Sequence, residues 1–212
     1  MTKRGIDVSK WQGVIDWNAV KMSGTDFAII KAGGSDAGFY TDSYFHQNYE
    51  KATKAGVDVG SYYIVGPKCL SAEDGAADAY RFIDIIKGKK FSYPVYLDWE
   101  LPPAGERLQS TLAARAFCDV MEKAGYYVGI YASDVSGFKE RLMLKDLSEY
   151  DIWVASYGAP PSYVKAFRAA YGMWQYSSSG TIAGISGNVD LDIAYYDFPT
   201  IMRANNLNGY RS

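Results

Sequence analysis

The chain has 212 residues, of which 48% are hydrophobic and 22% charged, so it is long enough to form one sizeable core. Its formal net charge of −2 argues against nucleic acid or an anionic membrane as the main partner. The single histidine, His46, excludes zinc sites built on two or three histidines, and Cys69 and Cys118 form no CxxC motif. If the chain is an enzyme, we expect carboxylates to be its catalytic groups.

The first 13 residues contain basic side chains but no apolar segment after them, so we expect no signal peptide in this chain. No apolar run approaches the roughly 18 residues that a membrane span requires, so we also expect no membrane insertion. No low-complexity stretch or charge block divides the sequence. These features predict a single domain covering residues 1–212.

Short apolar, β-branched or aromatic runs alternate with helix-like segments along the chain. Strands are predicted at residues 6–8, 27–31, 57–64, 94–99, 127–131, 152–156, 173–176 and 189–195. Helices are predicted at 42–55, with Asp42 as its cap, at 71–87, which opens with a Ser-x-x-Asp capping box, and at 108–124. This alternation predicts an α/β fold with a mainly parallel sheet, and the absence of a Gly-rich phosphate turn favours a barrel.

Carboxylates lie at the ends of three predicted strands, from the beginning, middle and end of the chain. They are Asp7, then Asp98 and Glu100, and finally Asp190 and Asp192. In a parallel barrel these strand ends form the active-site rim. Asp98 and Glu100 share one face of their strand, about 6.6 Å apart along it, while Trp99 takes the other face. Crowding raises the pKa of one carboxyl in such a pair, which provides the acid and the anion that glycoside cleavage needs.

Aromatic side chains flank the same rim, and such rings stack on the apolar faces of sugars while tyrosine hydroxyls bind sugar hydroxyls. Tyr62, Tyr131 and Tyr157 lie at strand ends and are the expected ligand contacts, whereas Trp153 is interpreted as a core residue. Lys31 ends another strand. The sequence leaves open whether Lys31 holds substrate or forms a salt bridge at the rim.

Several motifs in this order resemble glycoside hydrolase family 25, the Chalaropsis-type lysozymes of bacteria, phages and some fungi. They are GIDVSKWQG (5–13), Asp98-Trp99-Glu100, WVASYG (153–158), MWQYSSSG (173–180) and GISGNVDLD (184–192). The resemblance spans about residues 5–198, which we take as the core of the domain. It implies an irregular TIM-like (β/α) barrel with fewer helices than the regular fold.

The resemblance implies an N-acetylmuramidase that cuts the β-1,4 bond between N-acetylmuramic acid and N-acetylglucosamine in peptidoglycan, as a phage endolysin or a bacterial cell-wall hydrolase. By motif position, Glu100 is the implied general acid. Asp98 is its partner, which stabilises the charged centre or orients the 2-acetamido group, and Asp7 and Asp190 are supporting carboxylates. The expected substrate-binding residues are Tyr62, Tyr131, Tyr157, Lys31, Gln175 and Asp192.

Two positions depart from the family pattern. Relatives often have Asn at the position of Asp192, and many have Ala-Thr-Glu-Gly where this chain has Ala-Gly-Gly-Ser-Asp after Lys31. The sequence leaves open whether hydrolysis retains or inverts the configuration at the anomeric carbon.

Two rival functions also remain: a non-catalytic glycan-binding barrel, and a metal-dependent hydrolase, because clustered carboxylates also bind Mg²⁺ or Ca²⁺. We expect no metal, no cofactor and no nucleic-acid partner. The expected protein is a monomer that acts on the glycan strands of the bacterial cell wall, either extracellular or released by a phage.

Overall fold

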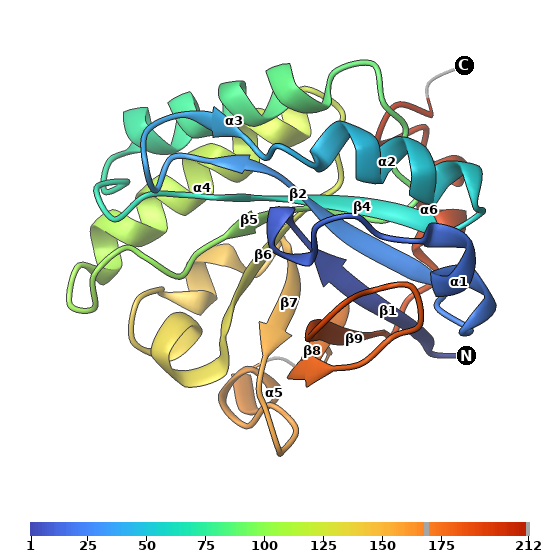
Figure 1. Cartoon of the computed structure of the whole chain (residues 1–212). Helices are drawn as coiled ribbons and strands as arrows, with labels where there is room; N and C mark the ends of the chain where they lie inside the picture. Colours follow the sequence, from blue (N-terminus) through green and yellow to red (C-terminus); the bar gives the residue numbers. More distant parts are fainter. Residues whose placement is uncertain (168–169, 211–212) are drawn as a thin grey trace.

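An eight-stranded β-barrel closes where β1 (Lys3–Val8) pairs with β2 (Phe27–Gly34), as Figure 1 shows. The computed structural model describes residues 1–167 and 170–210; residues 168–169 and 211–212, which belong to the expected domain, lie outside the described residues. The remaining barrel strands are β4 (Asp58–Ile64), β5 (Val95–Asp98), β6 (Val128–Ser133), β7 (Asp151–Ala155), β8 (Met173–Gly180) and β9 (Val189–Ala194). All eight predicted strands are therefore confirmed. The two-residue β3 (Tyr40–Thr41), which pairs with the end of β2, was not predicted.

The direction of β9 differs from the sequence-based expectation. Six of the eight barrel pairings are parallel, as predicted, but β9 runs antiparallel to both β8 and β1. Asp190 is the second residue of this strand and Asp192 the fourth. Because β9 runs the opposite way, its start lies at the rim where the parallel strands end, and Asp190 is paired with Asp7 in the ladder.

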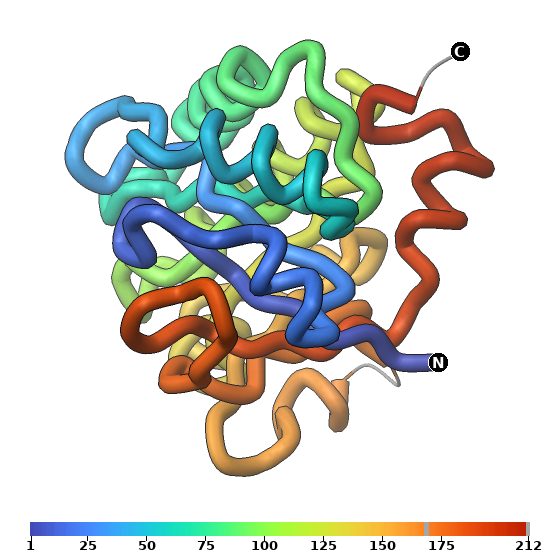
Figure 2. Tube along the Cα trace, turned by 45° about the vertical axis from the view of Figure 1, so that its right-hand side comes forward, coloured from blue at the N-terminus to red at the C-terminus, as the bar shows by residue number. Residues whose placement is uncertain are grey.

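The helices cover the barrel unevenly, which makes it irregular as expected. The helices α2 (Phe45–Lys54), α3 (Ala72–Ile86) and α4 (Arg107–Lys123) lie along the side formed by β2 to β6 (Figures 1 and 2). Elsewhere the described helices are the shorter α1 (Trp17–Met22), α5 (Tyr163–Phe167) and α6 (Phe198–Ala204), with 3₁₀ turns at Lys10–Gln12 and Leu144–Leu147 and a π turn at Asp134–Lys139. In the part of the chain that the structure describes, no helix is long and apolar enough to cross a membrane.

Two of the three predicted helices begin where the sequence places them, and one does not. Ser71 caps α3 through the expected box, in which its hydroxyl accepts from the Asp74 N–H at 3.1 Å. The prediction that Asp42 caps α2 is wrong, because the helix begins at Phe45. The buried Asp42 carboxylate instead accepts from the backbone N–H groups of Lys10 and Tyr44 and so holds the loop after β1.

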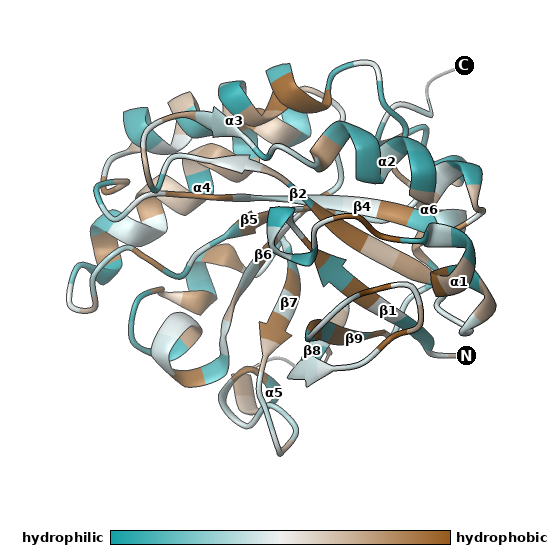
Figure 3. Ribbon diagram, viewed as in Figure 1, coloured by the Kyte–Doolittle hydropathy of each residue, from teal (hydrophilic) through white to brown (hydrophobic). Residues whose placement is uncertain are grey.

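Two hydrophobic cores support the rim. The larger lies between the helices and the barrel. In Figure 3, α2 is largely hydrophilic, whereas β5 and β7 are hydrophobic. The smaller fills the barrel with aromatic rings, including Tyr93, which stacks on Phe27 with ring centroids 4.2 Å apart. Phe198 from α6 packs 5.4 Å from Tyr93. Aromatic packing therefore fills the end of the barrel opposite the rim.

The close approach of α3 and α4 depends on Gly75, because a Cβ at this position would collide with the Ala113 carbonyl of α4. We expect Gly75→Ala to lower the free energy of unfolding by about 1–3 kcal/mol, since the two helix backbones must separate. Ala77→Ser adds one heavy atom at an exposed position of the same helix and should change the free energy of unfolding by less than about 0.5 kcal/mol. Urea denaturation of both variants tests this, and equal midpoints would contradict the packing argument.

Candidate active site

A cavity of about 210 Å³ opens at the rim where the parallel strands end. It is lined by eight of the residues predicted for the site: Asp7, Tyr62, Asp98, Glu100, Tyr131, Tyr157, Gln175 and Asp190. An adjoining cavity of about 170 Å³ shares five of these and adds Lys31. Asp192 is fully buried and lines neither cavity. The structure therefore brings the predicted residues together, with Asp192 alone set behind the surface of the cavity.

Asp98 and Glu100 reach the cavity from the end of β5. Asp98 is only 3% exposed, and its Oδ1 is a buried atom with no hydrogen-bond partner among the described residues. Glu100 lies two residues further on and is exposed. Trp99, between them, is fully buried and faces the other way, which confirms the predicted alternation. The pair thus consists of one carboxyl in the wall and one at the opening.

Burial raises the pKa of Asp98 well above its usual range, and the negative charge of Glu100 raises it further. Partial burial also raises the pKa of Glu100, while the charge of Lys31 and a hydrogen bond from Tyr131 oppose that rise. Lys31 lowers the pKa of Asp98 as well. Since both pKa values are shifted upward, the pair retains a proton at higher pH than two free carboxylates would.

Gln175 on β8 connects three of the predicted residues. Its Nε2 donates to Asp7 Oδ2 at 2.7 Å, and its Oε1 accepts from the hydroxyls of Tyr131 at 2.8 Å and Tyr157 at 2.6 Å. The side chain is 2% exposed, so these bonds form away from solvent. Gln175 therefore positions Asp7 and both tyrosines, and its direct contact with substrate stays a prediction.

A second group of carboxyls surrounds Asp7. Asp7 stands opposite Asp190 in the β1–β9 ladder, and Asp192 lies two residues further along β9. Burial raises the pKa of Asp7 well above its usual range, and the charges of Asp192 and Asp190 add to this. Burial also raises the pKa of Asp192 to about 8, although a bond from Trp153 opposes the rise. Asp192 Oδ2 is a buried atom with no hydrogen-bond partner among the described residues, which disfavours the ionised form of this carboxyl.

Trp153 and Lys31 complete the walls. Trp153 is 1% exposed, which confirms its interpretation as a core residue, but it also lines the cavity and donates from Nε1 to Asp192 Oδ1 at 2.8 Å. The Lys31 ammonium lies 5.8 Å from the ring centroids of both Tyr40 and Tyr62. Within the described ranges the direct ion pairs are Lys3–Asp26 and Arg115–Glu149. The rim salt bridge considered for Lys31 is therefore not formed, and Lys31 affects the acids at longer range.

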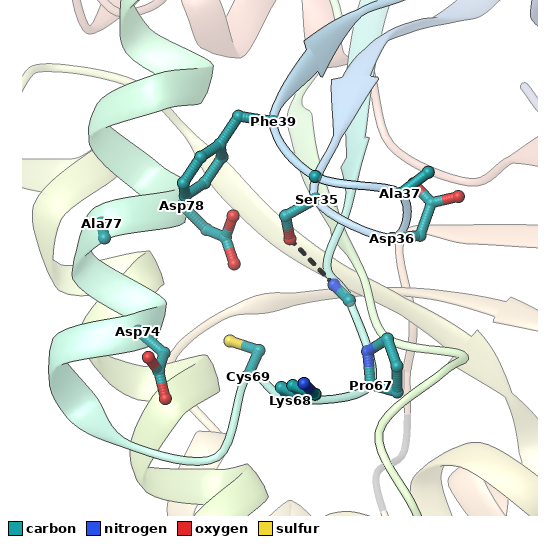
Figure 4. A pocket seen from close by; sticks show the side chains of 12 residues that line it. Ser35, Asp36, Ala37, Phe39, Pro67, Lys68, Cys69, Asp74, Ala77 and Asp78 are labelled. Atoms are coloured by element: carbon teal, nitrogen blue, oxygen red, sulfur yellow. Dashed lines mark hydrogen bonds between the residues drawn. The ribbon is translucent and has the colours of Figure 1, made fainter.

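A larger cavity, of about 420 Å³, lies between the loop after β2, the loop after β4 and α3, and shares no lining residue with the acid-lined cavities (Figure 4). Its buried carboxyl, Asp78, accepts from the Tyr63 hydroxyl at 3.0 Å, and its two loops are joined by a bond from Gly66 N–H to Ser35 Oγ. These contacts are structural. Across residues 1–167 and 170–210, no group of three or more His, Cys, Asp or Glu side chains has the arrangement of a metal site.

Comparison with known proteins agrees with this geometry. The family model for glycosyl hydrolases family 25 matches residues 6–185, most of the barrel and the greater part of the chain. The chain belongs to this family. It is 32% identical to the autolytic lysozyme of Clostridium acetobutylicum over 89% of this chain and 55% of that protein. It is also 31% identical to lysozyme M1 of Streptomyces globisporus, over 88% of this chain and 66% of that protein.

The chain thus spans between about half and two thirds of the length of these two family 25 relatives. Among solved structures, a bacterial lysozyme from Streptomyces coelicolor superposes with a TM-score of 0.72 at 29% identity. That comparison covers 96% of this chain and 97% of the Streptomyces coelicolor chain. The family 25 barrel is therefore present as a unit in this chain.

Trp11 and Ser178 are among the residues that line the cavities of this family 25 domain and were not predicted from the sequence. Trp11 lies in the first motif, four residues after Asp7. Its position on the loop that follows a barrel strand could have indicated that it lines the site. Ser178 lies in the irregular second half of β8, where register shifts prevent an argument from alternation.

The buried acid group predicts a pH-dependent stability. The pKa of Asp192 in the folded protein, about 8, exceeds its ordinary value of 3.8. The stability that the protonated Asp192 contributes to the folded protein is therefore fully present below about pH 4 and is lost as the pH rises toward 8. Asp192→Asn removes this titration while leaving an oxygen for Trp153. We expect the stability of the variant relative to the native protein to increase by up to about 1.4 kcal/mol per pH unit over this window.

Urea unfolding at several pH values between 5 and 8 measures this difference. Asp84→Asn, at an exposed position on α3, controls for the loss of one carboxylate. A constant difference between Asp192→Asn and the native protein across the window would show that Asp192 does not hold the proton.

Proposed function

We propose that this chain is a glycosidase, an N-acetylmuramidase that hydrolyses the β-1,4 bond between N-acetylmuramic acid and N-acetylglucosamine in bacterial peptidoglycan. The observation that carries the proposal is the Asp98–Glu100 pair at the rim of a family 25 barrel, in a cavity walled by tyrosines. The names of the relatives, an autolytic lysozyme and lysozyme M1, support the same substrate class.

Glu100 is the proposed general acid, because it is the more exposed member of the pair and can reach a leaving group at the cavity opening. It donates its proton to the glycosidic oxygen as the bond from that oxygen to the anomeric carbon breaks. Asp98, buried beside it, faces the developing positive charge or orients the 2-acetamido group. Water then supplies a hydroxyl to the anomeric carbon, and its remaining proton returns to the carboxylate pair.

The other site residues have supporting roles in this proposal. Asp7 and Asp190 are held together on β1 and β9, and Gln175 fixes Asp7. The expected sugar contacts are Tyr62, Tyr131, Tyr157, Lys31 and Gln175. Asp192, expected from the sequence to bind substrate, lies behind the cavity surface and would act on the sugar only through Trp153 and Asp7.

We further propose that residues 1–212 are a catalytic domain with a core at about 5–198. It acts as a monomer at the bacterial cell wall, either extracellular or released by a phage.

Glu100→Gln should reduce the rate of cell-wall hydrolysis about 10²–10⁴-fold, because glutamine keeps the shape of the side chain but has no proton to give. Asp98→Asn should also be severely impaired. Glu106→Gln, at an exposed position before α4, is the matched control and should remain fully active. Release of new reducing ends from purified walls measures the rate, and circular dichroism checks the fold. Near-native activity of Glu100→Gln would rule out its role as the acid.

The bond that is cut can be identified by mass spectrometry of digested peptidoglycan. We expect muropeptides that end in reducing N-acetylmuramic acid, and activity that persists in EDTA. Fragments that end in reducing N-acetylglucosamine would refute the muramidase assignment. Loss of activity in EDTA would favour a metal-dependent hydrolase, and binding to walls without new reducing ends would favour a non-catalytic glycan-binding barrel.

A further inference from the structure

The two acid-lined cavities extend from the catalytic pair in different directions. Both contain Asp98 and Glu100, but one reaches Tyr157, in the loop after β7, and the other reaches Trp11, in the turn after β1. Both aromatic residues are open to solvent, Tyr157 by 53% and Trp11 by 80%. The cavities together therefore form one groove with the acids in its middle and an exposed aromatic side chain at each end.

Trp11 is held in an ordered turn. The Ser9 hydroxyl accepts from the Trp11 backbone N–H at 3.3 Å, and the Ser9 N–H donates to the side chain of Gln12 at 2.9 Å. The Lys10 N–H donates to the buried Asp42 at 3.0 Å, and the Lys10 ammonium lies 5.1 Å from the centroid of the indole. The backbone on both sides of Trp11 is thus fixed while its side chain projects into solvent.

The exposure of Trp11 is unusual within this chain. Of the five tryptophans, Trp17, Trp99 and Trp153 are at most 3% exposed. Trp174 is half-buried, and its Nε1 donates to the Ser156 carbonyl at 2.8 Å. Leaving an indole in water forfeits the hydrophobic free energy that its burial would contribute. An exposed indole on a fixed turn at the end of an acid-lined groove is therefore suited to cover an apolar surface that arrives with the ligand.

We propose that Trp11 is a stacking platform for a sugar ring of the bound glycan, on the opposite side of the cut bond from Tyr157. This inference rests on the proposed muramidase function and assigns a positioning residue to it. The C–H face of a pyranose ring packs on the indole. Contacts at both ends of the groove then hold the strand across Glu100, so that the glycosidic oxygen stays within reach of the acid.

Steady-state kinetics on soluble glycan strands test this role. Trp11→Ala should raise KM about tenfold, the effect of losing one aromatic contact, while kcat stays within about twofold because the acids are untouched. Trp11→Phe should recover most of the loss, since it restores an apolar ring. Tyr80→Ala removes an exposed aromatic ring outside both cavities and should behave as the native protein. An unchanged KM for Trp11→Ala would overturn the proposal.

Fluorescence provides a readout that does not depend on turnover. In the Glu100→Gln background, iodide should quench the exposed Trp11, and saturating glycan strands should protect it. The same measurement in Glu100→Gln/Trp11→Phe isolates its signal from that of Trp174. Unprotected Trp11 in a glycan complex detected by calorimetry would contradict stacking. If the native protein releases no fragments that end in reducing N-acetylmuramic acid, the proposed function fails; if it releases them but the KM of Trp11→Ala is unchanged, only this inference fails.

Discussion

The antiparallel pairing of β9 with β1 is the constraint on which the site depends. If β9 ran parallel to its neighbours, the start of the strand would lie at the closed end of the barrel, far from Asp7. Because it runs the opposite way, Asp190 stands opposite Asp7 and Asp192 stands opposite Gln175 in the neighbouring ladder. The same strand that closes the barrel thereby brings the carboxyls from the two ends of the chain into one group.

Such a group is costly to bury, because each charge loses its hydration. The fold offsets the cost with specific partners, since Gln175 donates to Asp7 and Trp153 donates to Asp192. Burial also raises the pKa of Asp192 to about 8, which favours its neutral form. Those partners are themselves held by aromatic packing, since the Trp153 and Tyr131 rings lie 4.4 Å apart inside the barrel. The aromatic interior therefore both fills the barrel and orients the polar groups at its rim.

The sequence was sufficient to predict the eight barrel strands and the convergence of their carboxylates, because apolar runs and strand-end acids are local patterns. Strand direction is not local, since alternation looks the same in parallel and antiparallel strands, so the antiparallel direction of β9 was not predicted within the mainly parallel sheet. The bond from Gln175 to Asp7 joins residues 168 positions apart, which no local pattern reveals. An aromatic residue such as Trp11 is compatible with both core and surface, so its exposure became evident only in the structure.

The Asp98–Glu100 pair and the group formed by Asp7, Asp190 and Asp192 interact through charge. The charge of Asp190 raises the pKa of Glu100, whereas Lys31 lowers it. If Asp7, Asp190 and Asp192 were all ionised, their negative charges would raise the pKa of Glu100 further. Among the residues that line the two cavities, Lys31 is the cation that opposes this rise. A proton held behind the cavity reduces this repulsion. Glu100 can then carry the negative charge left after it donates its proton, while its own partial burial still raises its pKa so that a proton is there to donate.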